Sequence, residues 1–128
     1  MEITREIIVF DAADMDTESA FWASLLGGTV DPGEPGEKPE DDDWRTIRID
    51  GKARLAVQLA PDHQQPDWPD GTPQQIHLDL HVPDIRAAHE EATAKGARLL
   101  KAAEDLDAAD GFQVYADPAG HPFCLCWG

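Results

Sequence analysis

The chain repeats one pattern at a spacing of about 70 residues. Asp14 and Asp84, which both stand where a helix is predicted to begin, lie 70 positions apart. Gly27 and Gly96, which both follow the end of a predicted helix, lie 69 positions apart. A fixed internal period indicates one structural unit built twice, and it constrains the fold more than any single predicted element does.

The first half of the chain is predicted to form a strand, a helix and a hairpin. Residues 4–10 are rich in β-forming types and precede a segment with helical spacing of its apolar residues. Two further β-like runs, at residues 44–50 and 53–59, are separated by Asp50-Gly51. Such a pair favours a tight hairpin turn, so these runs are predicted to be adjacent antiparallel strands.

The second half begins with the clearest strand pattern of the chain. Residues 75–82 alternate strictly between apolar and polar side chains, which is typical of a half-buried strand. A helix is predicted from Asp84 to the cap at Gly96, because an aspartate begins helices and a glycine ends them. Three short strands complete this half, at residues 98–101, 111–116 and 122–127.

The predicted fold class is therefore α+β. We expect two tandem βαβββ modules that form a curved mixed sheet around a shared cleft, with the helices on the outer face. A length of 128 residues fits a single domain, residues 1–128. Within it, the first module covers about residues 3–60, a connector covers 61–74, and the second module covers about 75–127. Residues 31–43, rich in proline and acidic residues, are predicted to form an exposed loop.

The charge balance excludes some classes of partner. The chain has 26 acidic and 10 basic residues and a formal net charge of −16. A surface of this sign repels phosphate backbones and anionic lipid headgroups, so we expect neither nucleic acid nor membrane as a partner. The acidic excess serves solubility or a salty habitat, or it also draws cationic ligands toward a cleft. Both interpretations stay open at this point.

Cysteine usage and the N-terminus favour a cytoplasmic location. The chain has two cysteines, Cys124 and Cys126, which would point the same way on a strand and could not easily form a disulfide. The sequence has no disulfide framework of the kind typical of secreted proteins. The first residues lack the basic start and apolar run of a signal peptide, so we expect a reducing cytoplasm.

Four segments, in this order and spacing, carry a resemblance to a known family. The chain resembles the glyoxalase-like domain proteins of the vicinal-oxygen-chelate superfamily, which includes glyoxalases, bleomycin resistance proteins and dioxygenases. The resemblance covers roughly residues 5 to 127. The segments are VFDAAD at residues 9–14, FWASLLG at 21–27, HLDLHV at 77–82 and DPAGHPFCL at 117–125.

The resemblance implies a divalent cation held by four side chains, on the first and fourth strand of each module. Carried over by position, those places fall on Ile7, Gln58, His77 and Cys124. Ile7 has no donor atom, Gln58 offers a neutral amide, and Cys124 is a soft thiol where a carboxylate is expected. We therefore expect no metal or other cofactor. A divalent metal at His77, Gln58 and Cys124 is the alternative.

A second group of polar residues is independent of the inherited metal positions. His77, Asp79 and His81 share one strand face, and the 70-residue offset places Asp11 opposite His81. These side chains hydrogen-bond one another as structural partners, or they contact a ligand. They are also the candidate catalytic residues, since an imidazole beside a carboxylate can act as a general base.

Aromatic residues divide between core and cleft. Phe21, Trp22 and Phe123 have the spacing of core residues, and Tyr115 could face the cleft. Trp44 and Trp68 are expected either to stack on a flat ligand or to have an ordinary packing role. With them, the predicted ligand cleft comprises Ile7, Val9, Asp11, Gln58, His77, Asp79, His81, Cys124, Trp44 and Trp68.

Two functions follow from these observations. In the first, the chain binds a small organic molecule in its cleft without the usual divalent metal. In the alternative, it is a metal-dependent or acid/base-dependent lyase, isomerase or dioxygenase that acts on a small oxygenated substrate. The fold does not choose between them. In both cases we expect a homodimer, partly from the resemblance and partly because association covers open sheet edges.

Overall fold

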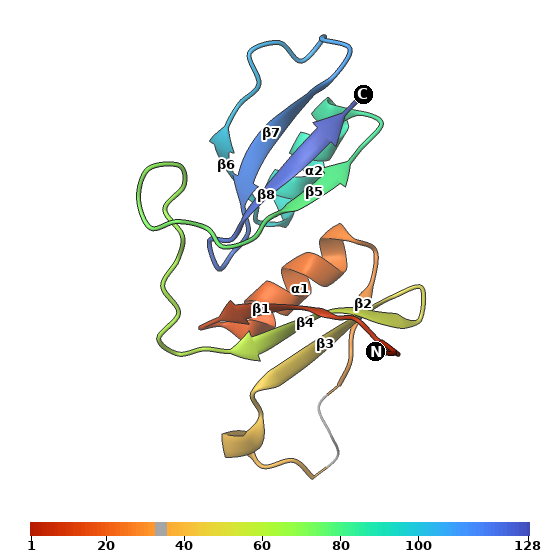
Figure 1. The fold of residues 1–128 in the computed structure, drawn as a ribbon, viewed down its shortest axis with the longest axis vertical. Helices are drawn as coiled ribbons and strands as arrows, with labels where there is room; N and C mark the ends of the chain where they lie inside the picture. Colours follow the sequence, from red (N-terminus) through yellow and green to blue (C-terminus); the bar gives the residue numbers. More distant parts are fainter. Residues whose placement is uncertain (33–35) are drawn as a thin grey trace. The chain divides into compact units, whose positions relative to one another are not determined.

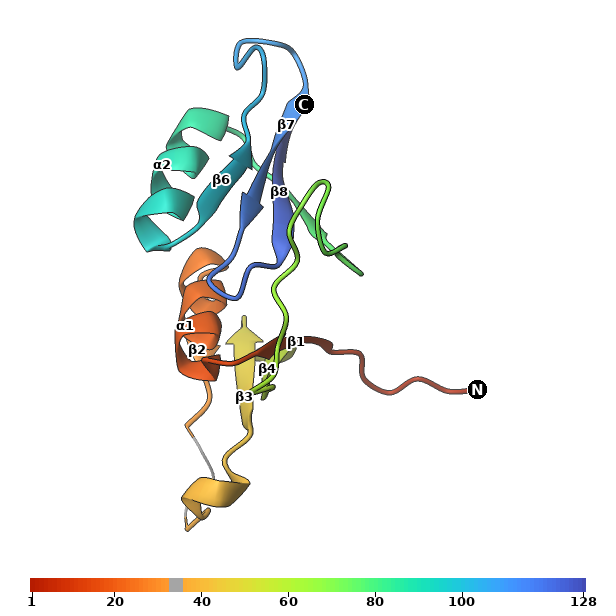
Figure 2. The same ribbon diagram turned by 90° about the vertical axis from the view of Figure 1, so that its left-hand side faces the viewer.

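A computed structural model describes residues 1–32 and 36–128. The chain divides into two compact units, Met1–His63 and Gln64–Gly128 (Figure 1). Each unit contains one four-stranded mixed sheet and one α-helix that lies along one face of that sheet (Figure 2). The predicted α+β class and the two tandem modules are confirmed.

In the first unit the strand order is β1-β4-β3-β2. Strand β1 runs parallel to β4, whereas β3 pairs antiparallel with both β4 and β2. This mixture follows from the chain order, because the helix carries the chain across the sheet and the later strands are joined by a hairpin. The elements are β1 (Ile8–Ala12), α1 (Met15–Leu25), β2 (Thr29–Val30), the 3₁₀ helix η1 (Pro39–Asp41), β3 (Trp44–Ile49) and β4 (Lys52–Leu59).

The second unit repeats this topology with the order β5-β8-β7-β6. Strand β5 is parallel to β8, and β7 is antiparallel to both β8 and β6. The repeat is exact in its opening elements, since β5 and α2 begin 70 residues after β1 and α1. The elements are β5 (Leu78–His81), α2 (Ile85–Lys95), β6 (Arg98–Lys101), β7 (Gly111–Ala116) and β8 (Pro122–Trp127).

Local side-chain chemistry sets the helix and turn boundaries as predicted. Asp14 accepts a hydrogen bond from the Thr17 backbone N–H at 3.0 Å. Asp84 does the same for two backbone N–H groups at the start of α2. Gly96 adopts a φ of 118° after α2, a left-handed conformation that favours glycine. The β3–β4 turn has positive φ at both Asp50 and Gly51, as a two-residue hairpin requires.

Two strands begin later than the sequence predicts, and the short strand β2 was not recognised in the sequence. Strand β1 begins at Ile8, not at residue 4, because Thr4, Arg5 and Glu6 are polar and exposed and have no apolar face to bury. Strand β5 begins at Leu78, which leaves His77 just before the strand. Strand β2 has only two residues, too few for a recognisable alternation. The predicted loop at 31–43 contains η1, and its residues 33–35 lie outside the described residues.

The core of the first unit is built on stacked aromatic rings. Phe10 of β1 and Trp22 of α1 stack with their ring centroids 5.1 Å apart, and Phe21 meets Trp22 edge-on. The indole N–H of Trp22 donates to the Glu18 carboxylate at 3.0 Å within the helix. Trp22 is 1% exposed, so the predicted core role of the helix aromatics is confirmed.

The core of the second unit combines aromatic packing with a buried polar network. Phe123, predicted as a core residue, is fully buried and stacks on Tyr115 at 5.6 Å. The Tyr115 hydroxyl lies 2.9 Å from His89 Nδ1 and accepts a hydrogen bond from the Gln113 amide at 2.7 Å. The suggestion that Tyr115 faces the cleft is therefore wrong. Register with Phe123 puts it on the helix side of the sheet.

Among the described residues, no helix combines the length and apolar character that a bilayer crossing requires.

Candidate functional site

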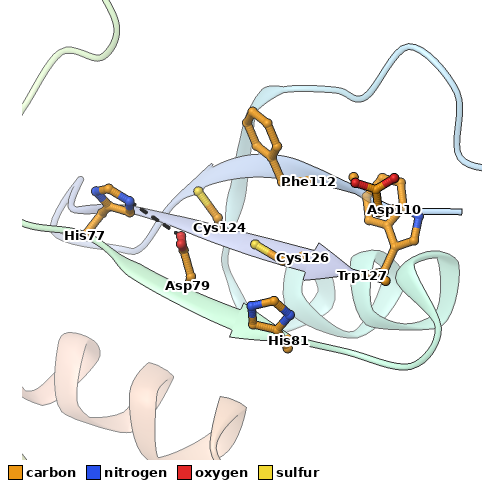
Figure 3. A pocket seen from close by; sticks show the side chains of 10 residues that line it. His77, Asp79, His81, Asp110, Phe112, Cys124, Cys126 and Trp127 are labelled. Carbon is orange, nitrogen blue, oxygen red and sulfur yellow. Dashed lines mark ion pairs between the residues drawn. The ribbon is translucent and has the colours of Figure 1, made fainter. Parts of the chain in front are cut away.

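Each sheet has one face toward its helix and one face turned away from it, here termed the open face. In the second unit, Leu78 and Leu80 share the helix side with Phe123, which is paired with Leu78. The alternation of strand side chains then puts Asp79 and His81 on the open face. Sheet register pairs Asp79 with Cys124 and His81 with Cys126. A carboxylate therefore lies beside one thiol and an imidazole beside the other (Figure 3).

These side chains line a pocket of about 540 Å³ on the open face of the second unit. His77, Asp79 and His81 form one wall, and Phe112 lies across the cysteine strand from them (Figure 3). Asp110 and Trp127 lie at one end of the pocket. The sequence prediction of a polar face on the strand around His77 thus leads to a concave site of mixed polar and apolar character.

Three possible metal ligands lie close together at one end of this pocket. The Nε2 atom of His77 lies 3.5 Å from an oxygen of Asp79, and both side chains are about half exposed. One ligand atom each from His77, Asp79 and Cys124 can be chosen so that all lie within 4.8 Å of one another. His77 and Asp79 thus form a carboxylate–imidazole pair, and the Cys124 thiol lies close to both.

The two thiols are held in their protonated form. Burial raises the pKa of Cys124 to about 12, and the Asp79 carboxylate adds to this effect through a hydrogen bond and its negative charge. Burial, and then the charge of Asp79, also raise the pKa of Cys126. Thiolates are the nucleophilic and metal-binding form of cysteine, so in the absence of a cation neither residue is activated at neutral pH.

A different set of predicted residues gathers on the open face of the first unit. Register pairs Asp11 with Gln58, and Gln58 with Trp44 on its other side. The Trp44 indole is 41% exposed and donates to the Thr46 hydroxyl at 3.1 Å. Val9 is on the same side of β1 as Asp11 and is also 41% exposed. This face combines apolar and hydrogen-bonding surface.

Besides His77, two predicted residues lie outside the strands. Ile7 stands just before β1 and is half-buried. Trp68 belongs to the segment between the two sheets and is half-buried too. Neither position is part of the pocket on the second unit.

Sheet register revises the equivalence of two inherited metal positions. Cys124 pairs with Asp79, whose counterpart 70 residues earlier is Val9, and Val9 pairs with Ala56. The counterpart of Cys124 in the first unit is therefore Ala56. Gln58, by contrast, corresponds to Cys126. Ala56 offers no donor atom either, so the revision removes another possible ligand.

The inherited divalent-metal site does not fit the residues present. Ile7 and Ala56 have no ligand atom, and Gln58 would contribute a neutral amide oxygen. Cys124 is protonated and soft, whereas hard divalent cations prefer anionic oxygen. Of the positions carried over, His77 alone is an ordinary ligand.

Sequence reasoning missed six residues of the pocket, two of which are the glycines Gly111 and Gly128. Cys126 shares the open face with Cys124 by simple alternation, a signal that was available. Phe112, Asp110 and Trp127 could not be assigned without the register of β7 and β8, which pairs Phe112 with Cys126. Gly111 completes this end of the site. A Cβ atom there would lie 2.4 Å from the Trp127 ring, so only glycine admits the indole at that position.

Comparison with known proteins assigns the fold to a family. The family model described as "Glyoxalase-like domain" matches residues 7–126. No curated protein matches the sequence. Several solved structures match over nearly the whole chain at low sequence identity, which shows a shared fold.

The fosfomycin resistance protein FosX from Listeria monocytogenes is one of these structures. It shares 13% sequence identity and covers 100% of this chain and 95% of its own, with a TM-score of 0.68. A glyoxalase/bleomycin resistance protein/dioxygenase family enzyme from Burkholderia phytofirmans shares 19%, with coverages of 94% and 95% and a TM-score of 0.65. A glyoxalase-related enzyme from Fulvimarina pelagi shares 16%, with coverages of 98% and 89% and a TM-score of 0.66.

Proposed function

The chain belongs to the glyoxalase-like domain family, and from this premise we propose that it binds a small organic molecule. The binding site is the pocket on the open face of the second unit, and binding does not use the divalent metal common in related proteins. The ligand class is a compact molecule with an apolar or aromatic part and a cationic or hydrogen-bond-donating group. The matching structures include a fosfomycin resistance protein and a glyoxalase/bleomycin resistance protein/dioxygenase family enzyme, so these two antibiotics belong to the starting set of compounds.

One observation carries this proposal. The same pocket brings carboxylates, Asp79 and Asp110, and imidazoles next to the exposed ring of Phe112 and the indole of Trp127. Ligand pockets typically combine an apolar lining with a few convergent polar groups. Protonated thiols form the floor between these walls, and in that state they act as small apolar groups.

Charge favours a cationic ligand over an anionic one. The two carboxylates of the pocket are exposed, and the whole chain has a net charge of −16. Such a field raises the local concentration of cations and lowers that of anions. An amine could pair with Asp79 while its apolar part covers Phe112.

A ligand screen tests the proposal. Thermal unfolding is followed by circular dichroism in the presence of amines, bleomycin-type glycopeptides and fosfomycin, because a ligand that binds the folded state raises the melting temperature. We expect a stabilising amine whose effect is lost in Asp79→Asn and kept in the control Glu104→Gln, an exposed acid outside the pocket. The absence of any stabilising compound, or equal losses in the two variants, would contradict the proposal.

The ligand atoms of His77, Asp79 and Cys124 support a second candidate. Their mutual separations within 4.8 Å would allow a borderline cation such as Zn²⁺ to be held within this one sheet, with the Cys124 proton released on binding. The alternative enzyme function would then use this site, or acid–base chemistry by His77, Asp79 and His81.

Metal analysis separates the two candidates. The chain is purified without a chelator, its metal content is measured, and Co²⁺ is added while thiolate-to-cobalt absorption is recorded. Stoichiometric metal and an absorption band that disappear in Cys124→Ser but remain in Cys126→Ser would favour the metal-dependent alternative. No bound metal and no band would leave the metal-free binding function in place.

We also infer that the two units act together as one domain and that the chain forms a homodimer in the cytoplasm. The edge strands β1, β2, β5 and β6 support association, because unpaired strand edges are commonly covered by a partner. Sedimentation velocity measures the oligomeric state directly. A monomer at micromolar concentration would contradict the homodimer.

A further inference from the structure

Basic side chains gather at the end of the first sheet where the β3–β4 hairpin turns. Arg5, Arg48, Lys52 and Arg54 line one pocket of about 510 Å³, which we term the basic pocket. It contains four of the ten basic residues of a chain that has 26 acidic ones. The charge of the basic pocket is therefore opposite in sign to the net charge of the protein.

Three of the four cations of this group have no ion pair with a described residue, in contrast to several cations elsewhere in the chain. Arg45 pairs with Asp16 and Asp42, and Arg86 pairs with Asp107. In the part of the chain that the structure describes, Arg5, Lys52 and Arg54 form no ion pair.

The pocket as a whole keeps an excess of positive charge. Arg48 is neutralised by Asp31, whose two oxygens lie 2.9 and 3.0 Å from its Nε. Glu6 is the one acidic residue of the lining. Three unpaired cations against one carboxylate leave a net positive site. Like charges within a Debye length repel one another, so an anion bound between them is stabilised.

The backbone holds three of these residues in fixed positions. Gly51 adopts a φ of 74° in the hairpin turn, which directs Lys52 into β4. The Arg48 guanidinium donates to the Gly51 carbonyl oxygen at 3.4 Å as well as to Asp31. Arg54 lies within β4, next to Leu55, which pairs with the first residue of β1. The positive site is thus built mainly on a hairpin, which limits the entropy lost on binding.

An apolar pocket adjoins the basic one. It has a volume of about 280 Å³, and its lining includes Ile8, Leu26, Ile49 and Leu55. The two pockets share Arg54 and Glu6. A molecule could therefore place an anionic head among the cations while its apolar part lies beside them.

We propose that the basic pocket and the adjoining apolar pocket form a second ligand site, for an organic anion with an apolar body. Lys52 and Arg54 bind the carboxylate or phosphate head, and Ile8 and Ile49 contact the body. This site belongs to the first unit and prefers the opposite ligand charge from the proposed pocket on the second unit. It therefore does not depend on the proposed function.

Binding of three small probes tests this proposal. Octanoate, octylammonium and inorganic phosphate are titrated separately into the full chain, and amide chemical shifts are followed by NMR. We expect saturable shifts at residues 48–55 with octanoate, weaker ones with phosphate, and none there with octylammonium. Shifts of the same residues with octylammonium, or none with octanoate, would overturn the proposal.

Matched charge variants make the test specific. Lys52→Gln with Arg54→Gln should weaken octanoate binding by about tenfold or more, because charge-assisted hydrogen bonds are lost. Arg98→Gln with Lys101→Gln removes the same formal charge from exposed positions on the second unit and should leave binding unchanged. Equal weakening in the two double variants would show that net charge alone governs binding and would overturn the site.

The apolar part of the site is tested separately. Ile49→Ser should weaken octanoate binding and leave phosphate binding unchanged, since only octanoate has a body that reaches Ile49. Circular dichroism confirms that the variant is folded. An Ile49→Ser variant that is folded and binds octanoate as tightly as the parent would contradict the apolar contact.

Discussion

The two units have the same frame and different open faces. Both sheets have the same strand order, and the aspartates that begin their helices are 70 residues apart. On the open face, the first unit presents Val9 and Asp11, whereas the second presents Asp79 and Cys124. The end of the first sheet also has the basic pocket around Arg54. The frame depends on caps, turns and the helix-side core, so the open faces were free to acquire different chemistry.

The cores differ as well, in a way that predicts different sensitivities. The first unit relies on stacked rings around Trp22. The second buries a polar chain in which Tyr115 joins His89 and Gln113. Packing of rings depends on volume, whereas a buried polar chain depends on the pairing of every member.

The largest effect is expected in the core of the first unit. Trp22→Ala removes a ring that is 1% exposed and should lower the free energy of unfolding by about 3–5 kcal/mol, because a large cavity is left. Trp44→Ala, at an open-face position that is 41% exposed, should cost less than about 1 kcal/mol. Denaturant unfolding monitored by circular dichroism measures both. Similar losses for the two variants would contradict the assignment of core and open face.

The second prediction concerns the reactivity of the second open face. A pKa of about 12 leaves Cys124 almost fully protonated at pH 8, so iodoacetamide should modify it about a hundredfold or more slowly than an ordinary thiol. Asp79→Asn should speed the reaction, since the Asp79 charge raises this pKa. Peptide mass spectrometry at several pH values gives the rates. Asp110→Asn is the control variant. Fast modification of Cys124 in the parent chain would contradict the conclusion that its thiol is protonated.

A smaller effect is expected from the polar network of the second core. Tyr115→Phe keeps the ring and removes the hydroxyl that bonds His89 and Gln113. The loss of stability should be about 1–3 kcal/mol, because the Gln113 amide is buried and loses its acceptor. Denaturant unfolding again measures the change. A Tyr115→Phe variant as stable as the parent would show that the network contributes nothing beyond packing.

The smallest effect is a pH dependence confined to the first helix. Hydrogen bonds from the Thr17 backbone N–H and hydroxyl lower the pKa of Asp14 below its ordinary value of 3.8. The stability that this carboxylate contributes is complete above about pH 4 and is lost as the pH falls through the lowered pKa. Asp14→Asn should therefore flatten the acid end of the stability curve. An unchanged acid transition would contradict this role of Asp14.

Much of the frame could be predicted from the sequence, because its determinants are local. Asp84 and Gly96 delimit a helix whatever surrounds it, and Asp50-Gly51 specifies a turn by its own conformation. The 70-residue period then indicated that these elements form two modules of the same topology. Strand β1 was placed too early because propensity does not reveal what a residue can bury.

The candidate site was predictable only in part. Alternation along β5 was enough to put Asp79 and His81 on one face. The register of β5, β7 and β8 decides which side of the sheet Tyr115 faces and whether Phe112 and Trp127 reach the pocket. Register depends on contacts between distant residues and cannot be read from the local sequence. The counterpart of Cys124 in the first unit depends on register as well, because Asp79 pairs with Cys124 and Val9 pairs with Ala56.

The tight fit between Gly111 and the Trp127 ring has a practical consequence for spectroscopy. The indole is held at the end of the pocket on the second unit, and its N–H donates to the Ala108 carbonyl oxygen at 3.0 Å. Trp22, in contrast, is enclosed in the first core. In a chain whose other tryptophans are replaced by phenylalanine, the intrinsic fluorescence of Trp127 would report occupancy of that pocket alone, so each unit can be given its own optical signal without an added dye.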